Sequence, residues 1–256
     1  MLSVINDFFI YILLLVLSIL NIVVPISGSS VVTPLLAILT DPHKAIGLAS
    51  FYFMMSSFVR VFLFRHNINW REINNLLPIS LLAAFFGALS LVAINSLVMY
   101  LIIFIFTVYF LAKKLRSVLN IQANTKQNKE KRMLSWTVGA LSGFLQGAGL
   151  AGSDLRNSYL LGRGLSLPEL HATTALVGAS NFLLATIVRL FTEQLTFPDL
   201  KPLIYIFPFI LAGILLGRKI LFKLSKKTAN IIVITVMVSI VVMLGYKILL
   251  VVFGNA

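Results

Sequence analysis

Long apolar stretches follow one another along the whole chain and are separated by short polar segments. Eight stretches can be drawn, and each is long enough, or nearly so, to cross the ~30 Å hydrocarbon core of a bilayer as an α-helix. Their bounds are Phe8–Leu39, Lys44–Phe64, Glu72–Ile94, Leu97–Ala112, Met133–Leu161, Pro168–Phe191, Pro198–Leu221 and Thr228–Phe253. The pattern predicts an all-α polytopic membrane protein without a soluble domain.

Two of these stretches are interrupted by glycine, serine and proline. In the first, Pro25–Ser30 separates Phe8–Val24 from Val31–Leu39, and in the fifth the break spans Gly147–Ser153. A bilayer core contains no water, so non-helical backbone is tolerated there only where it lines a cavity inside the protein. We therefore expect each broken stretch to form a re-entrant helical hairpin, with a functional site at the break.

The two halves of the chain share features in the same order. Ser27–Ser30 matches Ala151–Asp154 at an offset of 124 residues. Three further matches follow at offsets of 126, 127 and 130 residues, namely Ala45–Gly47 with His171–Thr173, Asn69–Trp70 with Thr196–Phe197, and Pro78 and Gly87 with Pro208 and Gly217. They predict a duplication, with transmembrane units at residues 1–116 and 133–256 and a basic cytoplasmic linker at residues 117–132.

The distribution of Lys and Arg favours the hairpins. With the basic loop Lys113–Arg132 in the cytoplasm and both hairpins re-entrant, fifteen of the 21 basic residues lie inside and only Lys44 and Lys201 lie outside. If every stretch crossed once, the split would be ten to seven, which the positive-inside rule disfavours. One hairpin and three crossings make an odd number, so the second unit is inverted. Inverted repeats with paired broken helices are typical of transporters whose site lies near the bilayer midplane.

Composition narrows the function classes. The chain is 59 % apolar and 11 % charged, and its net charge of +13 fits cytoplasmic loops better than nucleic-acid binding. It contains no Cys, which excludes thiolate chemistry and disulfides, and its three scattered His residues form no metal-binding motif. We expect no metal, no cofactor and no enzymatic activity. An anion channel or a non-transporting membrane subunit remains an alternative to a carrier, and an intramembrane enzyme is a weaker one.

The motifs around the breaks point to one family. The first unit carries Ser27-Gly-Ser-Ser-Val-Val-Thr-Pro-Leu-Leu36, and the second carries Gly143-x-x-Gln-Gly-Ala-Gly-Leu-Ala-Gly152, then Tyr159-Leu160 and Ala172-Thr-Thr-Ala175. In this order they resemble the sulfite exporter TauE/SafE family of small anion transporters, although serines replace several of the usual glycines and Asn157-Ser158 stands where Pro is common. The resemblance implies transport of sulfur-containing oxyanions or organic anions across the bacterial inner membrane. The oligomeric state, a homo-oligomer included, stays open.

Both breaks have the chemistry of an anion site. A helix that starts after Gly28 or Gly152 presents free N–H groups and the positive end of its dipole. Ser29, Ser30 and Ser153 add hydroxyl donors, although the same serines also serve as helix caps.

Arg156 is the strongest single candidate for substrate contact. Ser153, Arg156 and Asn157 are spaced i, i+3 and i+4 and so share one helix face. A planar guanidinium matches an oxyanion with two parallel hydrogen bonds, although Arg156 also has the alternative of snorkelling to the inner surface. Gln146 precedes the glycines, and we place it facing the same site.

Two ionisable residues are candidates for proton coupling. Asp154 either caps the half-helix, balances Arg156 or carries a proton. His171 begins a face of small and polar residues with Thr174, Gly178 and Asn181. We expect Thr174 and Asn181 to line the pathway. For His171, a water-exposed position near the cytoplasmic end is the favoured interpretation.

Arg60 and Arg189 occupy similar places near the ends of the second and sixth stretches. Long cationic side chains at such places reach back to the nearer membrane surface. Both are therefore predicted to be interfacial anchors.

Overall fold

The protein is all-helical over the residues that its computed structural model describes, which are 15, 18, 19, 29–119, 132–150, 152–221 and 226–254. In chain order the elements are α2 (Ser29–Leu39), α3 (Pro42–Phe64), η1 (Arg65–Asn67), α4 (Trp70–Ser90), α5 (Ser96–Leu119), α6 (Arg132–Gly147), α7 (Gly152–Gly162), α8 (Leu167–Phe191), α9 (Phe197–Leu221) and α10 (Lys226–Phe253). Within this part of the chain, five helices are long and apolar enough to cross a membrane. The expected all-α membrane architecture is confirmed.

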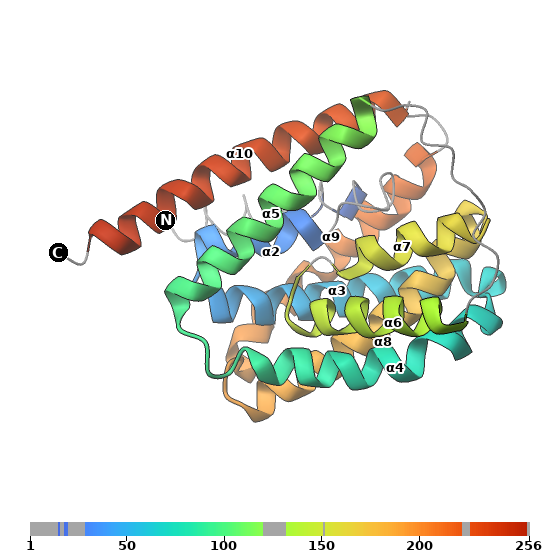
Figure 1. Ribbon diagram of the computed structural model, residues 1–256, viewed down its shortest axis with the longest axis horizontal. Coiled ribbons are helices and arrows are strands. Elements are labelled where there is room, and N and C mark those ends of the chain that lie inside the picture. The colour runs from blue at the N-terminus through green and yellow to red at the C-terminus, as the bar shows by residue number, and fades with distance from the viewer. Residues whose placement is uncertain are drawn as a thin grey trace.

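The helices lie side by side, with most of their axes along one direction (Figure 1). α3 and α8 pack against each other, and α4 packs on α6 and α8. α10 packs on α5, while the short α2 contacts α3, α5 and α10. The central position of α3 and α8 places their facing side chains in the interior.

Most helix bounds agree with the sequence pattern, and the differences have local causes. α3 begins at Pro42 because Asp41 caps it, its side chain accepting the N–H of His43 at 2.9 Å. α5 continues to Leu119, past the predicted end at Ala112, through lysine, leucine and arginine, which are good helix formers. The break in the fifth stretch lies between Gly147, where α6 ends, and Gly152, where α7 begins, and is narrower than predicted. The predicted segment Phe8–Val24 lies almost entirely outside the described residues.

Three glycines on one face of α6 allow it to pack closely on α4. Gly139, Gly143 and Gly147 recur every four residues, so they lie on one face of α6. A Cβ atom at Gly143 would lie 2.2 Å from the carbonyl oxygen of Ser80, and one at Gly147 would lie 2.1 Å from that of Ala84. The two backbones are in direct contact, the packing that small residues allow in membranes.

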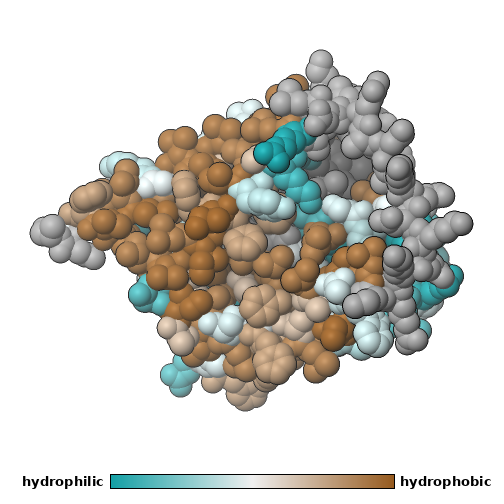
Figure 2. Space-filling model, in the orientation of Figure 1, coloured by the Kyte–Doolittle hydropathy of each residue, from teal (hydrophilic) through white to brown (hydrophobic). Residues whose placement is uncertain are grey.

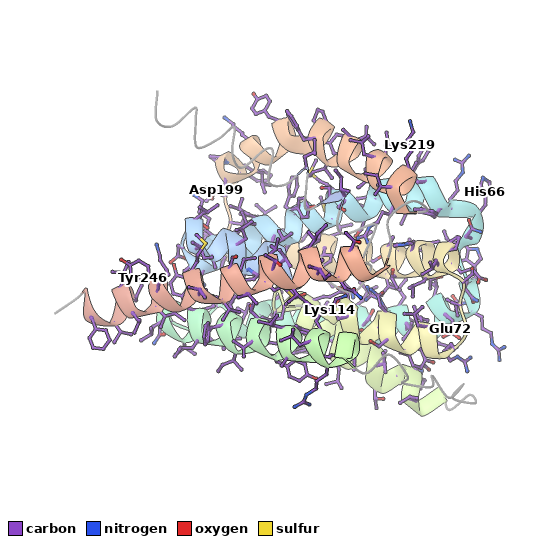
Figure 3. The ribbon with its side chains drawn as sticks, turned by 90° about the horizontal axis from the view of Figure 1, so that it is seen from above. His66, Glu72, Lys114, Asp199, Lys219 and Tyr246 are labelled. Atoms are coloured by element: carbon purple, nitrogen blue, oxygen red, sulfur yellow. The ribbon has the colours of Figure 1, made fainter. Side chains whose placement is uncertain are left out.

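The two ends of the helix bundle carry different polar residues. Asp199 and Tyr246 lie at one end, and His66, Glu72 and Lys219 lie at the other (Figure 3). Between the ends, apolar side chains cover most of the described face in Figure 2, as expected of a surface in contact with lipid.

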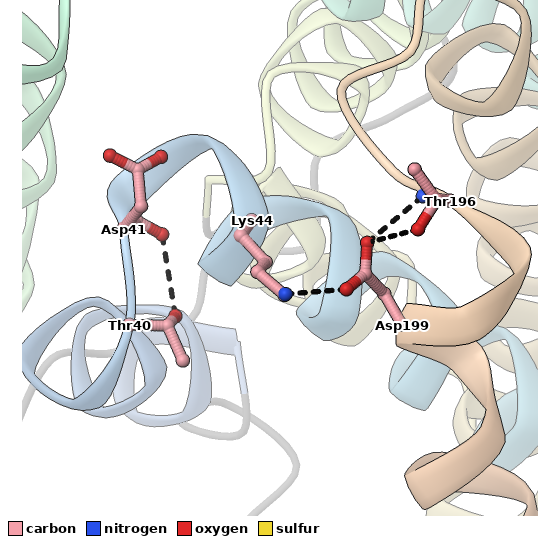
Figure 4. A network of polar contacts seen from close by, with 5 residues as sticks. All are labelled: Thr40, Asp41, Lys44, Thr196 and Asp199. Atoms are coloured by element: carbon pink, nitrogen blue, oxygen red, sulfur yellow. Dashed lines mark hydrogen bonds and ion pairs between the residues drawn. The ribbon is translucent and has the colours of Figure 1, made fainter.

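An ion pair connects two helices at each end of the bundle. Lys44 of α3 pairs with Asp199 at the start of α9, and Asp199 also accepts hydrogen bonds from the backbone and hydroxyl of Thr196 (Figure 4). At the opposite end, Arg163, just after α7, donates through Nε and Nη2 to Oε1 of Glu72 at 3.1 and 3.0 Å. This second pair anchors the end of α7 to α4.

Candidate functional site

The second break folds as a tight helical hairpin. After Gly147 the chain turns through Gly149, whose φ of +70° is in the left-handed region that favours glycine. Two backbone hydrogen bonds close the turn, from the N–H of Gly149 and that of Leu150 to carbonyls of α6. α7 then runs back beside α6 (Figure 1), so closely that a Cβ at Gly152 would lie 2.2 Å from the carbonyl oxygen of Ser142.

The start of α2 meets this hairpin. The Thr33 hydroxyl donates to the carbonyl of Gly149 at 3.0 Å, and Ser30 is hydrogen-bonded to the side chain of Asp154. Residues near the first break therefore contact residues of the second. Gly28 lies outside the described residues, and of Ser29 only the helical backbone is described.

A small cavity of about 20 Å³ lies between α3, α6, α7 and α8. Seven polar or charged side chains and three others line it: Ser57, Arg60, Gln146, Ser153, Arg156, Asn157 and Thr174, with Phe53, Gly178 and Phe182. Its volume holds about one water molecule. The cavity thus offers less space than a sulfite-sized anion needs.

Arg156 is held rigidly against this cavity. Its side chain is 1 % exposed, Nη1 donates to Oε1 of Gln146 at 2.8 Å, and Nη2 donates to the carbonyl of Thr174 at 3.1 Å. Its Nε has no hydrogen-bond partner. A buried guanidinium with a free N–H is a preorganised donor for an anion.

Arg60 lines the same cavity, which corrects the prediction that it is an interfacial anchor. Its Nη2 donates to the hydroxyl of Ser57 at 3.0 Å, and its Nε points to the carbonyl of Ser56 at 3.4 Å. Ser57 lies one turn before Arg60 on α3 and holds the guanidinium along the helix, which competes with snorkelling. None of the residues lining the cavity is acidic, so two guanidinium groups share it without a carboxylate.

Asn181, which is predicted to line the pathway, does not line this cavity. It is fully buried behind Gln146, to whose Oε1 its amide donates at 2.8 Å, and it accepts the Ser80 hydroxyl at 3.2 Å. Gln146 Oε1 therefore accepts from both Asn181 and Arg156. Asn181 orients Gln146 and does not contact the cavity itself.

Asp154 lies apart from the cavity. It is 1 % exposed, contacts Ser30, and lies near Lys113 and Lys114 of α5, while its Oδ1 has no hydrogen-bond partner. Two residues along a helix correspond to about 200°. Asp154 and Arg156 therefore lie on opposite faces of α7 and do not pair.

His171 and Arg189 are both buried, which corrects two further predictions. His171 is 1 % exposed and its ring stacks on that of Phe64 with centroids 5.6 Å apart, so it is not a water-exposed histidine. Arg189 is fully buried and donates to the Ser50 hydroxyl at 3.0 Å and to the carbonyl of Gly147, so it is not an anchor at the surface.

Sequence reasoning missed the contribution of α3 to the cavity. Phe53, Ser57 and Arg60 recur at i, i+4 and i+7, which puts them on one helix face. That spacing was the available signal. Among the described residues no group of three or more His, Asp or Glu side chains lies close enough to hold a metal ion.

Comparisons with known proteins agree with this architecture. The family model described as Sulfite exporter TauE/SafE matches residues 10–244, which is nearly the whole chain. No curated protein and no solved structure gives a significant match.

Proposed function

The chain belongs to the sulfite exporter TauE/SafE family, a family of multi-pass membrane transporters for small anions, and on this premise we propose that it is a secondary exporter of sulfur-containing oxyanions or organic anions of the sulfite and sulfonate type. The anion binds in the cavity between α3, α6, α7 and α8. The family consists of transporters and not of enzymes, so the enzymatic alternative is set aside.

The observation that carries this proposal is the pair of arginines that line one cavity. Arg60 and Arg156 face it together, and no acidic residue lines it. Two like charges in a medium of low dielectric repel each other, and an anion between them removes that cost. Ser153, Asn157 and Gln146 supply further polar contacts. The positive charge of the cavity is therefore uncompensated until a small anion enters.

Alternating access follows from the size of the cavity. In the described state it has room for about one water molecule. An anion must therefore be admitted by movement of the surrounding helices, as in a carrier, and not by diffusion through an open pore.

The order of the helices supports the two inverted units. α2 and α7 have 11 residues each, and each is followed by three long helices. α4 of the first half packs closely on α6, which belongs to the broken stretch of the second half. Reciprocally, α9 of the second half approaches the broken stretch of the first, since a Cβ at Gly213 would lie 2.7 Å from the carbonyl oxygen of Leu15. We assign residues 1–116 and 133–256 to the units and 117–132 to a cytoplasmic linker.

The driving force comes from the membrane potential or a proton. An inside-negative potential favours anion exit by about 2.3 kcal/mol per charge per 100 mV. Asp154 is the better candidate for a proton because it is buried and joins α7 to α2, while His171 is packed against Phe64. The inner membrane is the expected location, since it carries both the potential and the proton gradient.

Solute counterflow in proteoliposomes tests the proposal. Vesicles loaded with unlabelled sulfite, a sulfonate, thiosulfate or a carboxylate take up labelled sulfite, with and without a pH gradient. Saturable counterflow with one class identifies a carrier and its substrate. Flux that does not saturate indicates a channel, and absence of flux with every anion indicates a different substrate or a subunit that needs a partner.

Two variants connect the flux to the cavity. Arg156→Gln removes one cation and should abolish counterflow while the protein remains folded. In Gly178→Ala the new methyl would lie 3.5 Å from Arg156 Nη2 and from the Ser57 hydroxyl, an ordinary contact. This variant should fold as well as the wild type and bind the anion about tenfold more weakly, because the methyl occupies part of the site. Wild-type transport by both variants would remove this cavity from the mechanism.

A further inference from the structure

A line of facing residues continues from the cavity along the contact between α3 and α8. These helices pack side by side, and the hydrogen bond from Arg189 to Ser50 and the stack of His171 on Phe64 show that they run in opposite directions. The cavity residues Ser57 and Gly178 lie between these two contacts. Arg189 and Ser50 therefore lie on the side of the cavity opposite to His171 and Phe64.

Two phenylalanines form the wall between the cavity and Arg189. Phe53 and Phe182 both line the cavity, and their rings are stacked with centroids 5.2 Å apart and planes 28° from parallel. Phe53 follows Ser50 by three residues on α3, and Phe182 precedes Arg189 by seven on α8. Because Lys44, near the start of α3, pairs with Asp199, the ring pair lies on the side of the cavity that faces the Asp199 end of the bundle.

Arg189 is a further buried cation, outside the cavity, with an N–H group that has no acceptor. It is fully buried, its Nη1 donates to Ser50, its Nη2 donates to the carbonyl of Gly147, and its Nε has no hydrogen-bond partner. Among the described residues, none forms an ion pair with it. A buried, unpaired guanidinium is costly in a membrane protein, and such residues mark ion pathways.

We propose that Arg189 and Ser50 form a second anion-binding station on the far side of the Phe53–Phe182 pair, which the substrate occupies after it leaves the first cavity. The proposal rests on the proposed transport function. In the absence of an anion, the Gly147 carbonyl and the Ser50 hydroxyl hold the guanidinium of Arg189 in place. The same oxyanion that fits Arg60 and Arg156 supplies the acceptor that Nε lacks.

The position of Gly147 links the two stations. Its carbonyl accepts from Arg189, while the preceding residue, Gln146, accepts from Arg156. The C-terminal end of α6 thus lies between the two guanidinium groups. An anion that binds at the Nε of Arg189 also competes with the Gly147 carbonyl for the guanidinium. Its passage therefore loosens the hairpin turn between α6 and α7 on that side.

A charge introduced at Ser50 tests the station without removing Arg189. In Ser50→Asp the carboxylate pairs with Arg189 and competes with the substrate. We expect the half-saturating anion concentration measured from the Asp199 side to rise about tenfold or more, because the anion loses at least one charge-assisted hydrogen bond. The value measured from the opposite side should change less than about twofold, since the first cavity is untouched. Right-side-out and everted membrane vesicles give the two values.

Matched variants separate this station from the first cavity and from a purely structural arginine. Arg189→Lys keeps the charge but loses the planar donor, and should shift affinity on the same side as Ser50→Asp. Gly178→Ala should weaken binding from both sides. If Ser50→Asp and Arg189→Lys fold and keep their affinities on both sides, Arg189 only fastens the hairpin turn and the station is refuted, while saturable wild-type counterflow still supports the transport function.

A binding measurement covers the case of weak or absent flux. Sulfite should raise the melting temperature of the purified wild type, because a ligand that binds only the folded state stabilises it. With two stations, part of this shift persists in Arg156→Gln and disappears when Ser50→Asp is added. Complete loss in Arg156→Gln alone, with the variant folded, would contradict a second station.

Discussion

Replacement of Gly143 by Ala tests whether the contact between α4 and α6 positions the anion site. The added Cβ would lie 2.2 Å from the carbonyl oxygen of Ser80 and 2.6 Å from its Cα, both backbone atoms that no side-chain rotation moves. Relief of that overlap requires α6 to shift by about 1 Å. Overpacking of this kind costs roughly 1–3 kcal/mol.

The same shift should reach the cavity. Gln146 lies one turn after Gly143, and its Oε1 holds Arg156 and Asn181 through two hydrogen bonds of 2.8 Å. A displacement of about 1 Å breaks or bends both bonds, and misplacement on this scale lowers the rates of positioned reactions by about 10²-fold. We expect Gly143→Ala to reduce counterflow severely as well as to lower the melting temperature.

Gly162→Ala is the matched control, since Gly162 is also helical and an added Cβ there meets no atom within 4 Å. It should retain wild-type transport and gain up to about 1 kcal/mol from the better helix propensity of Ala. Both variants are assayed by thermal melting in detergent and by counterflow in proteoliposomes. Equal stability and transport in the two variants would refute the view that backbone contact at Gly143 fixes the site.

Two further predictions concern the supports of the site. Asn181→Leu leaves Gln146 without its second donor, so we expect transport to fall about tenfold and stability to drop by about 1–3 kcal/mol, measured by the same two assays. Glu72→Gln removes the carboxylate charge from the buried ion pair with Arg163 and should destabilise the protein by roughly 1–3 kcal/mol, whereas Asp199→Asn, in a more exposed ion pair, should cost less than about 1 kcal/mol. Equal effects of the two carboxylate substitutions on the melting temperature would contradict this ranking.

The sequence was sufficient for features that depend on spacing along one helix. Long apolar stretches predicted the helices, and the glycine cluster of the fifth stretch predicted the break between α6 and α7. The spacing of Ser153, Arg156 and Asn157 placed them on one face, and the structure puts all three on the cavity wall. These properties are local, because helix periodicity and backbone preferences determine them.

The features that sequence reasoning missed depend on neighbours from distant segments. Arg60 looks like an anchor by its position near a helix end, but it is half-buried and lines the cavity, where the Ser57 hydroxyl holds its guanidinium. His171 is buried because Phe64, more than a hundred residues earlier, stacks on it. Asn181 faces inward as predicted, yet Gln146 lies between it and the cavity. No pattern along one helix reveals which residue of another helix fills the space in front of it.

One contact bears on the duplication more directly than any similarity of sequence. At the offset of 124 residues that aligns the two breaks, Ser30 corresponds to Asp154, and these two side chains are hydrogen-bonded to each other. If the chain is built of two inverted units, as proposed, equivalent residues would meet where the axis relating the units passes between them, so this contact supports the proposed duplication and would place the axis beside the two breaks. At the same offset Arg156 corresponds to Val32, which carries no charge. In the proposed site the first unit therefore supplies the partner of Asp154 from α2 and the cation Arg60 from α3, whereas Arg156 comes from the second break and has no charged counterpart at the first, so two similar units would form a chemically asymmetric cavity.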